Sequence, residues 1–203
     1  VPVLCGGTGQ YISALIKGID FPKIPHNSEI RNELEIQWDE LGPDYLYTKL
    51  KLLDPNAADK IHPNDKKRVI RALEINQIST MNKGEVEDIS IEEGPEFNFF
   101  SYCLSPDREL LYERINKRVD EMLAKGLLDE ITYIRKKYPH ISKTASQAIG
   151  YKELFAYIDG NISLNEAIDK IKQSSRNYAK RQLTWFRKMD SLHWFSGTLH
   201  TDD

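Results

Sequence analysis

VPVLCGGTGQYISALIK, residues 1–17, is the stretch that decides the fold class predicted for this chain. Val1–Cys5 is an apolar run with the length of a buried strand. Gly6–Gly9 follows as a glycine turn, and Tyr11–Lys17 continues as a helix that Gly18 ends. Because a strand, a turn and a helix in this order form an α/β unit, we expect an α/β protein with a parallel sheet.

The rest of the chain alternates helical and strand patterns. The predicted helices are Ser28–Leu41, Pro43–Leu53, Asp65–Thr80, Pro106–Ala124, Leu127–Lys137, Tyr151–Tyr157 and Ser163–Lys188, and the later strands are Phe97–Leu104 and Leu192–Phe195. Phe21–Pro25 is predicted to be an extended linker, and Glu85–Glu96 an exposed acidic loop. Since helices separate the first two strands, we expect a core of residues 1–24 and 87–203, interrupted by an inserted helical lobe of residues 25–86.

Length and composition indicate a globular protein. Its 203 residues are 40% hydrophobic, and no run reaches the ~20 apolar residues that a membrane-spanning helix needs. Cys5 and Cys103 lie in apolar segments, so we expect reduced core thiols in a cytoplasmic protein. None of the histidines shares metal-ligand spacing with a cysteine or another histidine, so we expect no structural zinc site. The chain starts without Met inside a predicted strand, so we expect it to be the later part of a longer chain.

The last predicted helix has the charge pattern of a surface that binds a polyanion. Asp169–Lys188 contains seven Lys/Arg residues and one acid, although the net charge of the chain is -3. Ser163 and Glu166 have the spacing of a capping box, which marks the start of this helix. A solvated helix face without a ligand is the alternative, and the charge pattern by itself leaves it open.

Four other segments carry groups suited to a phosphate or a base. Gly6–Gly9 can present backbone N–H groups to an anion, although no Lys-Ser/Thr pair follows as in a Walker A loop. The turn Lys60–Arg68, the pair Arg114 and Arg118, and the loop Lys143–Tyr151 are the others. Each has a structural alternative: a tight turn, a capped turn, ion pairs with neighbouring acids, and a loop before a helix.

These segments together resemble one family. The matching motifs are Gly6-Gly7-Thr8-Gly9-Gln10-Tyr11, His62-Pro63-Asn64-Asp65, Arg71-Ala72-Leu73-Glu74, Gln147-Ala148-Ile149-Gly150-Tyr151, and Tyr178-Ala179-Lys180-Arg181-Gln182 with Thr184-Trp185-Phe186-Arg187. They are similar to motifs that occur in this order in tRNA dimethylallyltransferases, also called tRNA isopentenyltransferases. The resemblance extends from Val3 to Trp194.

The resemblance implies a fold and a reaction. The fold is a P-loop NTPase-like parallel-sheet core, incomplete here, with an inserted all-helical domain and a helical C-terminal part. The reaction transfers a dimethylallyl group from dimethylallyl diphosphate to N6 of adenosine 37, beside the tRNA anticodon. Mg²⁺ assists, with ligands mostly in a family segment that these residues lack. The family's P-loop and acidic base are also missing, so we expect this fragment to be inactive alone.

The resemblance also implies partners and site residues. The partners are the tRNA anticodon stem-loop and dimethylallyl diphosphate, with no membrane, and we expect a monomer. Thr8 near the target nucleotide and Arg118 on the diphosphate are the implied catalytic residues. The implied tRNA contacts are Thr8, Arg31, Lys60, Ile61, His62, Pro63, Asn64, Thr144, Ala145, Ser146, Gln147, Ala148, Ser175, Arg176, Asn177, Tyr178, Ala179, Lys180, Arg181 and Gln182. Ser175 stands where the family usually has Thr.

Two other functions stay open at this point. An adenylate-type isopentenyltransferase modifies a small nucleotide and needs neither an inserted lobe nor a basic helix, so both features argue against it. A non-catalytic RNA-binding module is the second alternative. The absence of a P-loop upstream of Val1 in the complete gene would favour that module.

Overall fold

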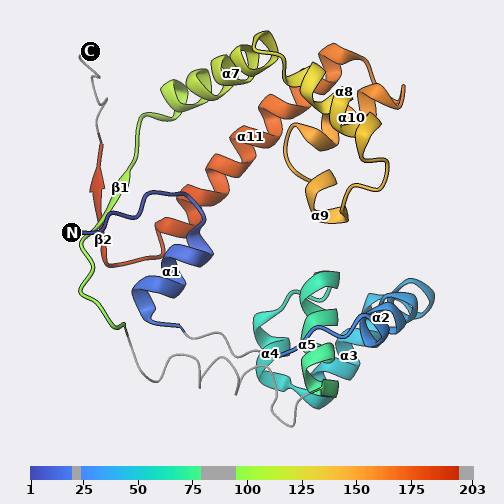
Figure 1. Ribbon diagram of the computed structural model, residues 1–203. Helices are drawn as coiled ribbons and strands as arrows, with labels where there is room; N and C mark the ends of the chain where they lie inside the picture. Colours follow the sequence, from blue (N-terminus) through green and yellow to red (C-terminus); the bar gives the residue numbers. More distant parts are fainter. Residues whose placement is uncertain (20–23, 79–94, 197–203) are drawn as a thin grey trace. The chain divides into compact units, whose positions relative to one another are not determined.

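The computed structural model describes residues 1–19, 24–78 and 95–196 (Figure 1). The chain divides into two compact units: one is Val1–Gly9 with Phe100–Asp203, and the other is Gln10–Phe99. The linker Phe21–Lys23 and most of the predicted acidic loop lie outside the described residues. Within the described ranges, no helix combines the length and the apolar character that crossing a membrane requires.

The unit Gln10–Phe99 is helical. It contains most of α1 (Gly9–Lys17), then α2 (Ser28–Leu41), α3 (Pro43–Leu53), α4 (Pro55–Lys60) and α5 (Lys66–Ile78). Local signals explain the starts of these helices. The Asn27 side chain accepts hydrogen bonds from two N–H groups of α2, and Pro43 stands in the first turn of α3. The buried Asp54 side chain accepts the Ala57 N–H at 2.9 Å and thereby starts α4.

Helices α2, α3, α4 and α5 enclose the core of this unit, to which α4 contributes Ala57 and Ala58. Leu34 of α2, Leu46 and Leu50 of α3, and Val69 and Leu73 of α5 are almost completely buried against one another. The side chains that these helices direct inward recur at helical spacing, as the sequence pattern predicts. The core gives the outer side chains of α2 and α5 a rigid base.

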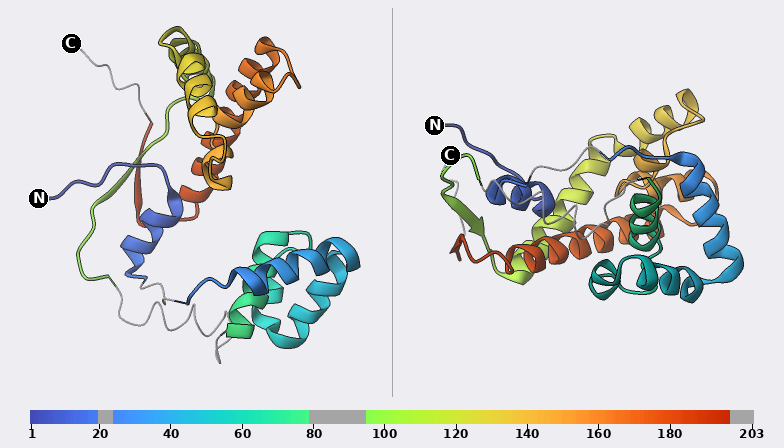
Figure 2. Two further views of the ribbon diagram at one scale, coloured as in Figure 1. Left: turned by 45° about the vertical axis from the view of Figure 1, so that its right-hand side comes forward. Right: turned by 90° about the horizontal axis from the view of Figure 1, so that it is seen from below.

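The second unit combines a small sheet with helices (Figure 2). Its elements are β1 (Ser101–Leu104), α7 (Arg108–Ala124), α8 (Leu127–Lys137), α9 (Lys143–Ser146), α10 (Tyr151–Ile158), α11 (Leu164–Phe186) and β2 (Leu192–Phe195). β1 and β2 pair in parallel, with Ser101 opposite Leu192 and Leu104 opposite Phe195. The hydrophobic core of this unit consists of Val119, Ile131, Leu154, Phe155, Ala167 and Ile171. α/β character is thus present as a two-stranded parallel sheet among helices.

The N-terminal strand prediction is wrong for this structure. Val1–Thr8 has no regular secondary structure, and Val1, Val3, Leu4 and Cys5 are exposed. A strand requires a neighbour that pairs with its backbone groups, and in the described sheet β1 and β2 pair only with each other. Both cysteines are free thiols as predicted, but Cys5 is not a core residue, and Cys103 is half-buried in β1.

Other boundaries differ from the prediction by local effects. Asp65 is the cap of α5 and not its first helical residue, because its Oδ1 accepts the Arg68 N–H at 3.2 Å. Residues 97–100 precede β1 without strand structure. The short helices α4 and α9 are absent from the prediction, since four to six residues give too little periodicity to detect.

Candidate nucleic-acid interface

The basic helix α11 is held in place by polar contacts with α7. Arg176 Nη1 donates to Asn116 Oδ1 at 2.5 Å, and one turn earlier on α11 Lys172 Nζ lies 2.6 Å from Asp120 Oδ1. The capping box predicted at the start of α11 is present, with Ser163 and Glu166 bonded to each other's backbone N–H groups. Arg176 and Lys172 therefore orient α11, and the exposed polar residues nearer its C-terminal end stay available for a ligand.

A pocket rich in cations lies between the start of α7 and the C-terminal half of α11. Its volume is about 190 Å³, and it is lined by Ser105, Pro106, Arg108, Leu111, Tyr112, Lys180, Leu183 and Arg187. Three of these side chains are positively charged and none is acidic. The guanidinium of Arg108 stacks over the Tyr112 ring at 5.2 Å from its centroid. Such a lining suits a phosphate or diphosphate group.

The sequence pattern predicts one cation of this pocket as a site residue but not the other two. Lys180 belongs to the predicted tRNA-contacting segment, whereas Arg108 and Arg187 do not. Arg187 lies in the motif that carries the family resemblance, and Arg108 and Tyr112 have helical i,i+4 spacing. The family motif could therefore have indicated Arg187, and the i,i+4 spacing with Tyr112 could have indicated Arg108.

The glycine turn packs against α11. Gln182 Nε2 donates to the Gly7 carbonyl oxygen at 2.8 Å. A Cβ on Gly9 would collide with the indole of Trp185, so this position requires a residue without a side chain. Two motifs 175 residues apart in sequence are thereby joined. Thr8, between these contacts, is exposed beside the predicted tRNA-binding segment of α11.

The predicted contact segment Ser175–Gln182 is divided between structural and exposed positions. Asn177, Lys180 and Arg181 are exposed, and Arg181 lies over the ring of Tyr178 at 5.8 Å from its centroid. Ser175 and Ala179 are half-buried, as is Arg176, whose guanidinium is engaged by Asn116. The exposed subset is the part that a ligand can reach.

The loop before α10 is tied to α11 by a buried acid. Glu153 accepts hydrogen bonds from the Gly150 N–H at 2.9 Å and from the Ser174 hydroxyl at 2.9 Å. Gly150 adopts a positive φ of 96°, which favours glycine. Thr144, Ala145, Gln147 and Ala148 are exposed, and Ser146 is half-buried. The predicted contact residues of this loop thus lie on a fixed surface of the unit.

Arg118 is exposed on α7 and does not line the cationic pocket. It follows Leu111 by seven residues, or about 10 Å along the helix. The ion pairs considered for Arg114 and Arg118 are made by other residues, because Asp120 pairs with Lys172 and Glu121 with Lys117. Arg118 has no hydrogen-bond or ion-pair partner among the described residues.

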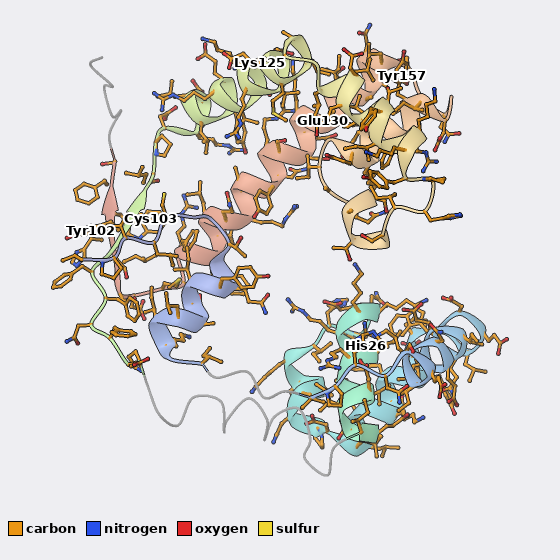
Figure 3. All side chains as sticks on the ribbon, in the orientation of Figure 1. His26, Tyr102, Cys103, Lys125, Glu130 and Tyr157 are labelled. Atoms are coloured by element: carbon orange, nitrogen blue, oxygen red, sulfur yellow. The ribbon has the colours of Figure 1, made fainter. Side chains whose placement is uncertain are left out.

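In the helical unit, Arg31 is bound to a buried carboxylate. Glu74 is fully buried and lies 2.7 Å from Arg31 Nη2 and 3.0 Å from Arg71 Nη1, and it also accepts the Asn27 N–H at 3.0 Å. Burial opposes ionisation of Glu74, but these cations and the N–H group outweigh it and hold its pKa below the usual range. Figure 3 labels His26, whose Nδ1 lies 3.5 Å from the same carboxylate.

The turn Lys60–Asn64 contains both exposed and core residues. His62 and Asn64 are exposed, and His62 Nδ1 accepts the Asn64 N–H at 3.2 Å. Lys60 is exposed and Pro63 half-buried. Ile61 is 4% exposed in the hydrophobic core, so its side chain anchors the turn and cannot reach a ligand.

The resemblance places the expected Mg²⁺ ligands mostly in a segment outside these residues. In the part of the chain that the structure describes, no group of three or more His, Cys, Asp or Glu side chains is arranged to hold a metal ion.

Comparison with known proteins decides the family. A family model described as IPP transferase matches residues 1–189. The chain belongs to the IPP transferase family. A tRNA dimethylallyltransferase of Halothermothrix orenii is 44% identical over 196 residues, covering 97% of this chain and 60% of that protein. One from Alkaliphilus oremlandii is 43% identical over 97% of this chain and 62% of its own length.

Solved structures agree with this membership. The full-length tRNA isopentenylpyrophosphate transferase of Bacillus halodurans is 41% identical with a TM-score of 0.56, covering 93% of this chain and 57% of that one. A eukaryotic dimethylallyltransferase acting on tRNA gives a TM-score of 0.73 at 29% identity, covering 94% of this chain and 50% of that one. This IPP transferase chain therefore spans about three fifths of the length of the curated relatives it matches.

Proposed function

We propose that the protein containing this chain transfers a dimethylallyl group from dimethylallyl diphosphate to N6 of adenosine 37 in tRNA. Two relatives that are 44% and 43% identical to this chain are tRNA dimethylallyltransferases, which supports this proposal. According to this proposal, the chain binds the anticodon stem-loop of the tRNA. The reaction forms a bond from the adenine N6 to the dimethylallyl carbon, breaks the carbon–oxygen bond to diphosphate, and releases diphosphate and a proton.

The observation that carries the proposal is the cationic pocket between the start of α7 and the C-terminal half of α11. Arg108, Lys180 and Arg187 line the pocket, and no acid is among its lining residues in the described part of the chain, so the pocket favours a phosphate-bearing ligand. Gln182 joins the glycine turn to the same helix at 2.8 Å from the Gly7 carbonyl oxygen. Fixed cations stabilise the charge on RNA phosphates and the charge that develops on a departing diphosphate.

Residue roles follow from accessibility. Thr8 is exposed next to α11, which suits a position near the target nucleotide. We assign Arg118 to the diphosphate, since its guanidinium is exposed and has no partner among the described residues. Arg31 would contact RNA from a position held by Glu74, and His62 and Asn64 from the exposed turn.

The larger architecture is part of the same proposal. The parallel pairing of β1 with β2 suits a P-loop NTPase-like sheet core of residues 1–24 and 87–203. Residues 25–86 would then be an inserted helical lobe that holds the anticodon arm. We also propose that the protein is a monomer and that it is located in the cytoplasm.

Binding of the chain to an anticodon stem-loop with adenosine at position 37, over a salt series, tests the RNA part. We expect Lys180→Ala with Arg187→Ala to weaken binding and to flatten the salt dependence by about 1.5 in the log–log slope, because each lost phosphate contact removes about 0.7–0.9. Lys170→Ala, an exposed cation on the same helix, is the matched control. An unchanged slope for the double variant would contradict the assignment.

Competition separates the alternatives. AMP that displaces the stem-loop at equal concentration would support an adenylate-type enzyme instead. Transfer of labelled dimethylallyl to the RNA by the full-length protein distinguishes the enzyme from a non-catalytic RNA-binding module, which binds the stem-loop but leaves it unlabelled.

A further inference from the structure

A second basic region extends from α8 to the start of α10. Ile131–Lys152 contains no aspartate or glutamate and five Lys/Arg residues, in a chain that has 31 acids and 28 Lys/Arg residues overall. Arg135 is neutralised, because its Nη2 lies 3.0 Å from both carboxylate oxygens of Asp159. Lys136 and Lys137 have no carboxylate within ion-pair distance among the described residues. Two adjacent positive charges are thus left for an external partner.

One of these lysines is held on the surface by two exposed aromatic rings. Lys137 Nζ lies 5.2 Å from the centroid of the Tyr133 ring and 5.5 Å from that of Tyr138. It also donates to the Tyr133 hydroxyl at 2.8 Å. Tyr133 is 58% exposed and Tyr138 53% exposed, so the whole group faces solvent. A cation held in this way loses less side-chain entropy when it binds a phosphate than a free lysine does.

The group is continuous with a segment already proposed to contact RNA. α8 ends at Lys137, and α9 begins at Lys143 in the same unit (Figure 1). Thr144 and Ala145 of α9 are exposed, as are Gln147 and Ala148 in the loop that follows it. Figure 3 labels Glu130 on α8, where its carboxylate accepts the Tyr151 hydroxyl at 3.0 Å, so this acid is engaged locally.

We propose that Tyr133, Lys136, Lys137 and Tyr138, here called the α8 platform, bind the sugar–phosphate backbone of the RNA stem next to the loop that α9 contacts. The inference rests on the proposed function and adds a contact outside the anticodon loop. Unpaired cations on an exposed helix end suit the accessible phosphates of a stem, because a duplex is recognised mainly through its backbone and shape. The tyrosine rings and hydroxyls can contact ribose groups between those phosphates.

The test measures binding of the chain to two RNAs over a salt series. One is the anticodon stem-loop, and the other is the loop alone as a single-stranded oligonucleotide. Lys136→Gln with Lys137→Gln removes both charges of the platform. Lys117→Gln, which removes an exposed cation paired with Glu121 on α7, is the matched control. Tyr133→Phe keeps the ring beside Lys137 but removes the hydroxyl that accepts its hydrogen bond.

We expect the double variant to bind the stem-loop with a log–log salt slope flatter by about 1.5, corresponding to two lost phosphate contacts. Its affinity for the loop oligonucleotide should be unchanged. The affinity of Tyr133→Phe for the stem-loop should lie between those of the double variant and the unaltered chain. An unchanged slope, or equal weakening for both RNAs, would overturn the α8 platform but not the proposed function. Both would be overturned if the full-length protein, tested in the same way, bound neither RNA.

Discussion

Replacing Glu74 by glutamine removes the one negative charge that Arg31, Arg71 and the Asn27 N–H share in the helical unit. The substitution keeps the size of the side chain and an oxygen acceptor, so it changes charge more than packing. Glu74 itself is fully buried, but the side chains of Arg31 and Arg71 are 33% and 34% exposed. Water therefore screens the two cations partly when the carboxylate is gone.

The expected cost follows from these contacts. A hydrogen bond to a charged group contributes about 1.5–3 kcal/mol to stability. Because the cations are partly exposed, the summed contribution of the contacts to Glu74 is smaller than the sum of such values. We expect the free energy of unfolding of the helical unit to fall by about 2–3 kcal/mol at pH 7. That loss corresponds to a roughly 30- to 150-fold larger population of the open state.

The loss should depend on pH with a defined sign. The pKa of Glu74 is lowered in the folded state, so its stabilisation is complete above the unfolded value of about 4.3 and is lost as the pH falls through the folded value. The difference between the chain and its Glu74→Gln variant should therefore shrink at pH values below about 4.3.

Hydrogen exchange read by mass spectrometry measures this difference element by element. Amides of α5 report on the helical unit, and amides of α8 in the other unit serve as an internal reference. Protection relative to an unstructured peptide at the same pH removes the intrinsic pH dependence of exchange. His26→Gln controls for the neighbouring imidazole. A stability difference that stays constant from pH 7 to pH 3 would refute the electrostatic argument.

Two further substitutions test contacts in the other unit. Gly9→Ala should cost about 1–3 kcal/mol, because the added methyl group overlaps the Trp185 indole; unchanged urea unfolding and tryptophan emission would contradict that contact. Glu153→Ala should cost about 1–3 kcal/mol by leaving the Gly150 N–H and the Ser174 hydroxyl without their acceptor. Thermal unfolding measures the second effect, and Glu153→Gln should recover part of it if hydrogen bonding is the cause.

Much of the helical structure was predictable from residues close in sequence. Ser28–Leu41, Pro43–Leu53 and Leu127–Lys137 have the bounds that patterning predicts, and the Ser163 capping box marks the start of α11. Caps, prolines and apolar periodicity act within a few residues, so they can be recognised without a tertiary structure. The excess of cations on α11 is a property of the same kind.

The candidate site was less predictable because its side chains take their partners from distant segments. Arg176 and Lys180 lie on one helix and appear equivalent in sequence. In the structure, Arg176 is bonded to Asn116, 60 positions away, whereas Lys180 lines a pocket. Likewise, burial of Ile61 and exposure of His62 depend on the core that α3 and α5 form.

The sequence by itself determined the positions of most helices, the charge of α11 and the resemblance to the family. Only the tertiary structure decided that Val1–Cys5 is not a strand, that Glu74 binds Arg31, and that Gly9 gives room to Trp185. The physical reason is the separation in sequence between the residues that interact. Helical hydrogen bonds and caps join near neighbours, whereas strand pairing, buried ion pairs and close packing depend on which distant residues the fold brings together.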